Sequence, residues 1–320
     1  MKFLITGVSG FIGSSLALRL IEQGYKVTGI YSNSKKSSLN SKINLIRANL
    51  LEMNEDHISQ ILDVEAVIYC AGRAHIMNDT SEDSIGDYRK INRDAAIKFA
   101  ELAAIKQVKR FIYVSTIKVN GESSNPKESF VSKIGNKPTD PYALSKYEAE
   151  IGLLNIAKRT NMEVVIIRPP LVYGPGVKAN LKRLISLVRT NLPLPFGSIK
   201  NLRSHISLIN LCSFIECCSI KEKTPRAGNE VFVISDGIDL STPDLIKKIS
   251  KNYGSNTLVF RFPLFLVKFI FKILRQEKIT SRLIDNLQID NTKAYKLTNW
   301  RPVISIDEQL SLMAKYDEKK

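Results

Sequence analysis

Tyr142 and Lys146 stand four residues apart in the segment Tyr-Ala-Leu-Ser-Lys, a spacing that places both side chains on one face of a helix. A free tyrosine has a pKa near ~10, which is too high for a base at neutral pH. A lysine cation beside the ring would stabilise the phenolate and lower that pKa. The pair could then exchange a proton with a substrate hydroxyl, so these residues predict general acid–base catalysis of an oxidation or a reduction.

A glycine-rich turn lies near the start of the chain, where residues 7–13 read Gly-Val-Ser-Gly-Phe-Ile-Gly. Three glycines at a strand-to-helix junction allow a tight turn, close approach of backbone amides to a pyrophosphate, and close packing of the helix on the sheet. The helix N-terminus also favours negative charge. The turn therefore predicts a dinucleotide site that includes Gly7, Gly10, Phe11, Ile12 and Gly13.

Short apolar runs alternate with helical patterns around these residues. Apolar residues three and four apart, such as Ile12, Leu16 and Leu20, predict helices between the runs, and the first helix, from about Phe11, is expected to end at Gly24. Such alternation is typical of a parallel sheet with helices on both faces. We therefore predict an α/β fold, a Rossmann-like doubly wound parallel sheet, with strands at Phe3–Thr6, Lys26–Tyr31, Asn44–Arg47, Ala66–Cys70, Arg110–Val114 and Val164–Arg168.

The pattern changes after Arg168, where prolines and glycines at 169–170, 174–176 and 193–195 interrupt short mixed elements. We expect a smaller, irregular α/β C-terminal domain that lies against the carboxyl edge of the sheet. The predicted division is a dinucleotide-binding domain at residues 1–168, with parts of 205–235, and a substrate domain made mainly of residues 169–320.

The chain is basic, with 47 Lys and Arg against 31 Asp and Glu and a formal charge of +16. These residues are scattered and accompany no nucleic-acid-binding motif, so we expect no nucleic-acid partner. The four cysteines show neither a disulfide framework nor metal-ligand spacing, which favours a reducing, cytoplasmic compartment and no metal site. The chain begins directly with a strand, and we expect no signal peptide.

The apolar segment 258–274 contains Arg261, Lys268 and Lys272 and is interrupted by Pro263. It is too short and too charged for a membrane span of about 20 apolar residues. A strand followed by an amphipathic basic helix is the preferred interpretation, with the helix packed on its own domain. Weak contact with a membrane surface is the alternative.

The form Gly-x-x-Gly-Phe-Ile-Gly resembles the extended short-chain dehydrogenase/reductase superfamily, in particular its NAD-dependent epimerase/dehydratase family. The segment Val-Ser-Thr at 114–116 and the Tyr-x-x-x-Lys pair follow in the expected order, and the resemblance extends along nearly the whole chain. It implies that Thr116, Tyr142 and Lys146 form the catalytic set. It also implies further cofactor contacts from Tyr142, Lys146, Asn49, Leu50, Ala71, Gly72, Asn92 and Pro169, although many relatives have Asp where Asn49 stands.

The second strand is followed by residues that bear on the choice of cofactor. An acidic residue there would bind the ribose 2′-hydroxyl of NAD, but residues 30–38 contain no carboxylate. Hydroxyls and lysines suit a 2′-phosphate better. We therefore favour NADP, held by Ser32, Asn33 and Lys36, over NAD, and the alternative interpretation of these residues is an exposed basic loop.

The resemblance also implies a nucleotide-sugar substrate. Asn180 and Arg203 match family positions that grip a nucleoside diphosphate, and Arg282 is a plausible second arginine for the pyrophosphate. The segments 73–79 and 117–122 are the most individual and are similar to a bacterial polysaccharide branch of the family. They add Arg73, His75, Lys118 and Asn120 as candidate sugar contacts, although a lone histidine is more often structural.

This branch includes 4-ketoreductases that form UDP-N-acetylquinovosamine and proteins labelled UDP-glucose 4-epimerase. The missing carboxylate after the second strand favours a reductase that consumes NADPH and acts on a UDP-4-keto-6-deoxy-N-acetylhexosamine in surface polysaccharide (O-antigen) biosynthesis. A UDP-glucose or UDP-N-acetylglucosamine 4-epimerase is the alternative, and a non-enzymatic NADP-binding regulator is a remote one. The helices expected near 82–105 and 141–160 resemble those that pair subunits, so we expect a homodimer.

Overall fold

The computed structural model describes residues 1–32, 41–54, 63–73, 84–273 and 277–319. In this part of the chain, seven strands form a parallel sheet in the order β10-β7-β5-β4-β1-β2-β3, which confirms the doubly wound α/β prediction. The chain reverses its direction across the sheet between β1 and β4, the switch point where such sheets bind ligands. The strands are β1 (Lys2–Thr6), β2 (Lys26–Tyr31), β3 (Asn44–Arg47), β4 (Ala66–Tyr69), β5 (Arg110–Val114), β7 (Glu163–Arg168) and β10 (Val231–Val233).

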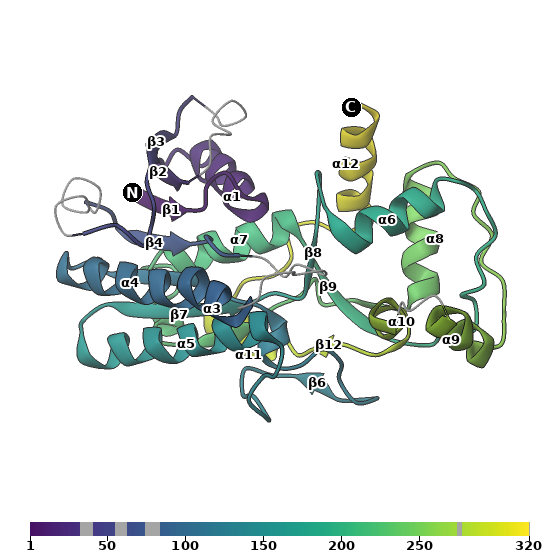
Figure 1. The fold of residues 1–320 in the computed structure, drawn as a ribbon. Helices are drawn as coiled ribbons and strands as arrows, with labels where there is room; N and C mark the ends of the chain where they lie inside the picture. Colours follow the sequence, from purple (N-terminus) through teal and green to yellow (C-terminus); the bar gives the residue numbers. More distant parts are fainter. Residues whose placement is uncertain (33–40, 55–62, 74–83, 274–276, 320) are drawn as a thin grey trace.

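Helices cover both faces of this sheet (Figure 1). On one face, α1 (Phe11–Glu22) and α7 (Leu208–Ser219) bury residues such as Leu16 and Phe214 against the strands. On the other face, α4 (Ala95–Ile105) and α5 (Pro141–Arg159) bury Phe99 and Leu153. The strands consequently read as almost uninterrupted apolar runs, as expected for a sheet that is covered on both sides.

Helix α1 ends as its sequence predicts. Gly24 has a φ of +80°, in the left-handed region that favours glycine, and the Tyr25 amide donates to the Leu20 carbonyl at 3.0 Å. This bonding satisfies carbonyls that the last helical turn would otherwise leave open. The turn fixes where β2 begins, and therefore where β2 ends at the carboxyl edge of the sheet, the edge that carries the glycine-rich turn.

A second lobe lies beyond the carboxyl edge of the sheet, on the right of Figure 1. Residues such as Ile185, Ile249 and Met313 form its apolar core. The three-stranded sheet β11-β9-β8 leads into it from β7. Its elements are β8 (Leu171–Tyr173), β9 (Arg203–Ser207), β11 (Asp239–Leu240), α6 (Ala179–Val188), α8 (Thr242–Asn252), α9 (Leu264–Ile273), α10 (Glu277–Ile284) and α12 (Ile306–Glu318).

Short elements complete the fold. The Trp300 ring, just after α11 (Thr292–Thr298), meets the Phe214 ring of α7 at 5.2 Å between centroids. The remaining elements are β6 (Ser129–Phe130), which pairs with β12 (Gln288–Ile289), the helix α3 (Ser84–Arg89), the π-helical turn η1 (Lys90–Asp94), and the 3₁₀ turns η2 (Ile117–Val119) and η3 (Pro225–Ala227).

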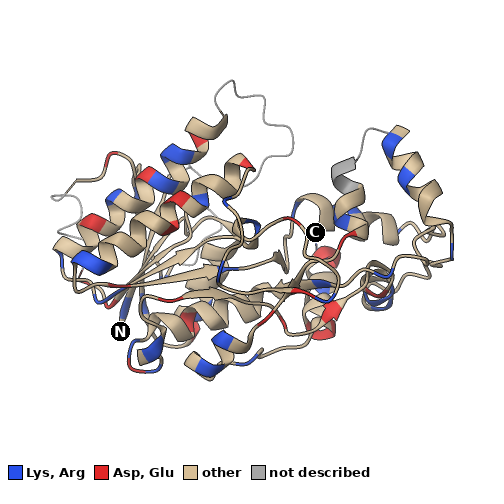
Figure 2. Ribbon diagram, turned by 90° about the horizontal axis from the view of Figure 1, so that it is seen from below, with Lys and Arg blue, Asp and Glu red and all other residues tan. Residues whose placement is uncertain are grey.

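The charged residues are spread over both lobes, with positive and negative positions interspersed (Figure 2). No helix in the described ranges has the length and apolar character to cross a bilayer.

Candidate active site

The glycine-rich turn sits at the carboxyl end of β1 and opens α1, as the sequence predicts. Gly7 has a φ of +67°, and a Cβ there would lie 2.8 Å from the Ala71 backbone. A Cβ at Gly13 would lie 2.3 Å from the Gly7 carbonyl oxygen. These glycines therefore allow β1, α1 and the end of β4 to approach more closely than any side chain would permit.

This turn fits the pyrophosphate of a dinucleotide. Gly10 is the N-cap of α1 and has no side chain to bond the first helical amides. Those amides belong to the first turn, which begins with Phe11 and Ile12, and they stay available to an anion at the switch point of the sheet. The residues present thus suit the cofactor that the family resemblance implies.

The residues predicted to hold the adenosine end are only partly described. Ser32 is exposed directly after β2, whereas Asn33 and Lys36 lie outside the described residues. After β3, the Asn49 amide donates to the Glu52 carboxylate at 2.7 Å, and Leu50 is half-buried against the core. The choice between NAD and NADP therefore stays a prediction from the sequence.

Asn92 organises the loop after β4 from inside the protein. Its Oδ1 accepts the Arg73 amide at 2.9 Å, and its Nδ2 donates to the Ser145 hydroxyl at 3.0 Å. A Cβ at Gly72 would lie 3.0 Å from Asn92 Oδ1 and 3.3 Å from Lys146 Nζ. The Asn92 side chain is fully buried and bonded to protein groups, an arrangement that supports the loop, and the predicted contact with the cofactor stays a prediction.

Tyr142 lies in the first turn of α5, and Thr116 lies just after the carboxyl end of β5. Their side chains are in contact. Asp140 caps α5 by accepting the Ala143 amide at 2.9 Å, and Pro141 occupies the first helical position. This start places Tyr142 where its side chain shares a hydrogen bond with Thr116. The structure therefore brings together the predicted hydroxyl pair.

The expected effect of Lys146 on Tyr142 is not observed. Burial raises the pKa of Tyr142 to about 12, and the hydrogen bond with Thr116 lowers it only in part. Lys146 is itself buried and donates to the Val114 carbonyl at 3.0 Å, with its Nζ 4.6 Å from the centre of the Tyr113 ring. Burial lowers the pKa of Lys146 to about 8. The prediction that the lysine lowers the tyrosine pKa is thus wrong for this structure, because desolvation dominates.

Tyr88 lies between Arg73 and Tyr142, the predicted catalytic tyrosine, and contacts both. The Tyr88 and Tyr142 rings meet edge to face at 5.8 Å, and the Arg73 guanidinium lies 5.3 Å from the centre of the Tyr88 ring. Arg73 also forms an ion pair with Asp87 at 2.9 Å. His75, another predicted sugar contact, lies outside the described residues.

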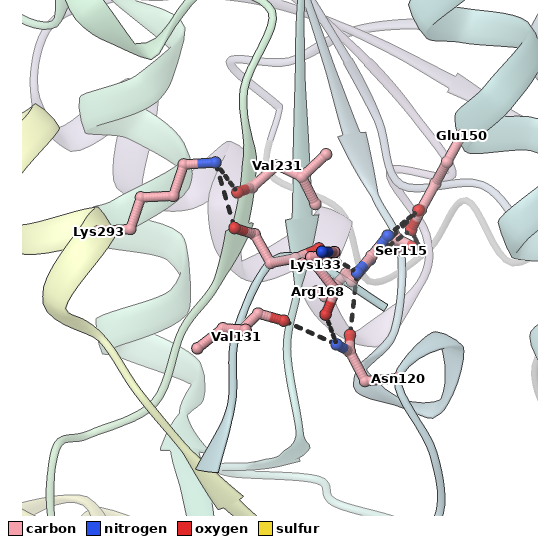
Figure 3. Close-up of polar contacts among 9 residues, drawn as sticks. Ser115, Asn120, Val131, Lys133, Glu150, Arg168, Val231 and Lys293 are labelled. Atoms are coloured by element: carbon pink, nitrogen blue, oxygen red, sulfur yellow. Dashed lines mark hydrogen bonds and ion pairs between the residues drawn. The ribbon is translucent and has the colours of Figure 1, made fainter. Parts of the chain in front are cut away.

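A buried ion pair between Arg168 and Glu150 lies close to the predicted catalytic residues in the chain, and Figure 3 shows its polar contacts. The Arg168 and Glu150 side chains are only 4% and 3% exposed and meet at 2.5 Å. Ser115, next to Thr116, donates to Glu150 at 2.5 Å, and Glu150 lies one helical turn beyond Lys146. The Ile117 amide donates to Pro169 at 2.9 Å. These contacts therefore join the ends of β5 and β7 to α5, next to the predicted catalytic residues Thr116 and Lys146.

Asn120 joins this cluster through its half-buried side chain. Its Oδ1 accepts from Arg168 at 3.0 Å, and its Nδ2 donates to the carbonyls of Val131 at 2.7 Å and Lys133 at 3.3 Å (Figure 3). Both amide atoms thus have protein partners, and a contact between Asn120 and the sugar stays a prediction. Lys118 forms ion pairs with Glu122 at 2.7 Å and Asp140 at 3.7 Å, and its role toward substrate stays a prediction.

A cavity of about 280 Å³ opens in the second lobe beside β8 and β9. Leucine and phenylalanine side chains from α6, β11, α8, α9 and α10 form most of its wall. Three predicted substrate residues, Asn180, Arg203 and Arg282, converge on it. Arg203 Nη1 donates to the Asp285 carbonyl at 2.8 Å, which fixes the guanidinium at the cavity wall.

Two buried polar atoms in this wall have no hydrogen-bond partner within the described chain, namely Asn180 Oδ1 and His205 Nδ1. Burial and the nearby Arg203 lower the pKa of His205 to about 4, so its ring is neutral at pH 7. Buried polar atoms without partners cost free energy unless a ligand or water satisfies them. The arginines of the cavity suit an anion, the two unpartnered atoms suit a group that forms hydrogen bonds with them, and the leucine-rich wall suits an apolar portion of the ligand.

Sequence reasoning missed Tyr88, His205, Glu150 and Arg168. A carboxylate four residues after Lys146, on the buried face of α5, was the available signal for Glu150. Alternation in β9 places His205 two residues from Arg203 on the same face, which was the signal for His205. Tyr88 gave none, because its neighbour Tyr142 is 54 residues away along the chain.

Comparisons with known proteins agree with this architecture. The model of the NAD dependent epimerase/dehydratase family matches residues 3–218. A UDP-glucose 4-epimerase of Vibrio cholerae is 36% identical over 314 residues, which cover 96% of this chain and 92% of that protein. The fold resembles that of UDP-glucuronic acid 4-epimerase from Bacillus cereus in complex with NAD and that of UDP-glucose 4-epimerase from Thermotoga maritima with UDP-glucose. Each has a TM-score of 0.76 at 22% identity and covers 100% of this chain and 99% of the other. The chain therefore belongs to the NAD dependent epimerase/dehydratase family.

Proposed function

We propose that the protein is a nucleotide-sugar oxidoreductase that acts at C4 of a UDP-hexose, as a 4-ketoreductase of a UDP-4-keto-6-deoxy-N-acetylhexosamine. The observation that carries this proposal is the hydrogen bond between Thr116 and Tyr142 at the carboxyl edge of the sheet, with Lys146 one helical turn beyond Tyr142 and held by the Val114 carbonyl. Relatives with the same fold bind UDP-sugars.

The cavity supports a nucleoside diphosphate as the anchoring group. Arg203 and Arg282 offer guanidinium groups suited to pyrophosphate oxygens. Asn180 Oδ1 and His205 Nδ1 offer polar atoms, and the surrounding leucines suit the flat face of a base. We assign the diphosphate to the arginine side of the cavity, with the sugar directed toward Tyr142.

The bound nicotinamide supplies or accepts the hydride. The chain's own residues manage the proton at O4. With its pKa raised to about 12, Tyr142 is a phenol at neutral pH, the form that donates a proton to the oxygen of a ketone under reduction. Thr116 orients the phenol through their hydrogen bond, and Lys146, held by the Val114 carbonyl, adds positive charge close to the developing alkoxide.

The phenol form of Tyr142 suits proton donation to a C4 ketone, a step that a reductase and the second half of an epimerase reaction share. The absence of a carboxylate in residues 30–38 favours NADPH, which a reductase consumes in each turnover. We therefore propose NADPH as the preferred cofactor, within a family that is NAD-dependent as a whole.

A 4-epimerase is the second candidate, and one observation favours it. The Vibrio cholerae relative that aligns over 96% of this chain is a UDP-glucose 4-epimerase. An epimerase oxidises C4, rotates the ketone and returns the hydride, so it uses the same three residues and regenerates its cofactor within one turnover.

A spectrophotometric assay separates the two reactions. Purified protein is mixed with NADPH or NADH and a UDP-4-keto-6-deoxy-N-acetylhexosamine, and the reduced nicotinamide absorbance is followed. Stoichiometric loss with NADPH supports the 4-ketoreductase and its cofactor. No loss, together with interconversion of UDP-glucose and UDP-galactose in the presence of NAD, makes the protein an epimerase and overturns the NADPH assignment.

The proposal includes a cytoplasmic setting and a homodimeric assembly. Reduced cysteines suit a reducing compartment, where nucleotide-sugar and NADPH would both be at hand. The expected pairing surface is formed by α4 and α5.

A further inference from the structure

Helix α9 leaves an apolar face uncovered. Its inner side buries Val267 and packs Leu264 and Phe271 against the core of the second lobe. Its outer side exposes Phe265, Phe269 and Ile273 by 71%, 59% and 64%. These three residues are four apart, so they form one stripe along the helix. Large aromatic side chains gathered in this way mark an interaction surface.

Basic residues border this stripe. Lys268 and Lys272 are exposed on α9, each three residues after a phenylalanine of the stripe, and the helix carries positive positions without negative ones (Figure 2). In the sequence, residues 258–276 contain two Arg and two Lys and neither Asp nor Glu. The surface thus combines apolar side chains with a single sign of charge.

We propose that α9 docks on an anionic membrane surface. Phe265, Phe269 and Ile273 enter the boundary between headgroups and acyl chains, and Lys268 and Lys272 bind the lipid phosphates beside them. An amphipathic basic helix of this kind lies in the plane of the interface and does not cross it. Apolar burial and attraction to anionic lipid act together, and the attraction weakens as salt rises.

The charges disfavour a second copy of the chain as the occupant. A two-fold interface places the same patch of both subunits face to face. Two copies of Lys268 and Lys272 would then lie close together without acidic residues from the same helices, and like charges so placed oppose association.

Docking at α9 would also orient the candidate active site. Phe271, on the inner side of the helix, lines the cavity of the second lobe together with Arg282 and Leu283 of α10. The membrane would therefore lie against the outside of a helix whose inside forms a wall of that cavity. The docking proposal itself stands whichever sugar the enzyme uses.

Vesicle co-sedimentation of the full chain tests this proposal. Vesicles of phosphatidylcholine alone are compared with vesicles that contain phosphatidylglycerol. We expect binding to the anionic vesicles that falls as salt rises. The Phe265→Ser/Phe269→Ser variant should weaken that binding by about tenfold or more. The Lys268→Gln/Lys272→Gln variant should weaken it by roughly fivefold or more, on anionic vesicles only.

Matched controls remove exposed residues of the same kind elsewhere. Leu312→Ser on α12 and Lys182→Gln on α6 should leave vesicle binding unchanged. The proposal is overturned if wild-type protein ignores anionic vesicles, or if the α9 variants bind as well as the controls, because net charge alone would then explain binding. Light scattering that shows a dimer dependent on Phe265 and Phe269 would equally overturn it, in favour of a second copy.

Discussion

At the scale of single residues, the catalytic assignment depends on the Tyr142 hydroxyl. Tyr142→Phe removes the proton path but keeps the ring that packs on Tyr88. We expect turnover to fall by about 10²–10⁴-fold, while cofactor affinity measured by fluorescence titration survives. Tyr147→Phe, on the same helix and away from Thr116, is the control and should keep full activity. Undiminished turnover in Tyr142→Phe would sink the mechanism.

The pKa of Lys146 sets a second residue-scale prediction. Burial lowers this pKa to about 8, so the ammonium loses its proton as pH rises through about 8, and kcat/KM for reduction should fall above that pH. The same shift means that the folded chain binds fewer protons than the unfolded chain between about 8 and the ordinary 10.5, so this residue's contribution to stability grows with pH across that window.

A pH–rate profile of Glu150→Gln tests whether Lys146 causes the fall in kcat/KM at high pH, the alkaline limb of the profile. The Glu150 carboxylate raises the pKa of Lys146, so its removal should move the alkaline limb to lower pH. A limb that stays in place in this variant would assign the titration to another group.

The residue scale also shows where sequence reasoning ends. The four-residue spacing of Tyr142 and Lys146 was enough to predict that both side chains share one face of a helix, because residues one helical turn apart are close in sequence. The direction of the Tyr142 pKa was mispredicted, because it depends on burial by strands and helices that are distant in sequence. The protein contacts of Asn120 could not be predicted for a related reason, since its partner Arg168 lies on another strand.

At the scale of elements, the glycine-rich turn allows α1 to approach the end of β1 closely at Gly13. Gly13→Ala would place a Cβ 2.3 Å from the Gly7 carbonyl oxygen and force the helix away from the strand. We expect lower stability and a loss of cofactor affinity, because the first-turn amides move with α1. Gly135→Ala, where a Cβ meets no described atom within 4 Å, is the control. Equal cofactor affinity in both variants would contradict this role of the turn.

The Arg168–Glu150 pair gives a second prediction about elements, because it joins β7 to α5. Arg168→Met leaves the Glu150 carboxylate buried without its partner and should cost about 3–5 kcal/mol of unfolding free energy in urea denaturation. Arg159→Met breaks the exposed pair with Glu101 and should cost less than about 1 kcal/mol. Similar costs for the two variants would mean that the buried pair does not hold the elements together.

The strands of the first lobe could be predicted nearly to the residue, because a sheet covered on both faces produces continuous apolar runs. The switch point followed from the glycine turn. The place of β10 at the sheet edge could not be predicted, because β10 returns from beyond residue 230 after the chain has passed through the second lobe. An amphipathic basic helix was predicted in the segment of α9, but which of its apolar residues stay exposed could not be predicted, since an apolar face reads the same in sequence whether or not it is covered.

At the scale of the whole molecule, the expected homodimer remains to be measured. Helices α4 and α5 lie side by side on one face of the sheet, and Ile151 of α5 is exposed there. If two copies pair these helices, Ile151 lies in the interface and its burial contributes to association. Light scattering of wild-type protein should then give twice the chain mass.

Ile151→Asp would put a charge into that interface and should yield monomers, whereas Leu312→Asp, an exposed apolar position on α12, should leave the dimer intact.

The α4–α5 surface and the α9 stripe lie on different lobes, so the dimer would keep both copies of α9 open to a membrane. If light scattering gives the mass of a single chain for wild-type protein at micromolar concentration, the dimer prediction is wrong, and each α9 would bind the membrane as part of a monomer. Pairing through α4 and α5 would instead give the assembly two copies of α9, and with both engaged the affinity for vesicles should exceed that of Ile151→Asp monomers.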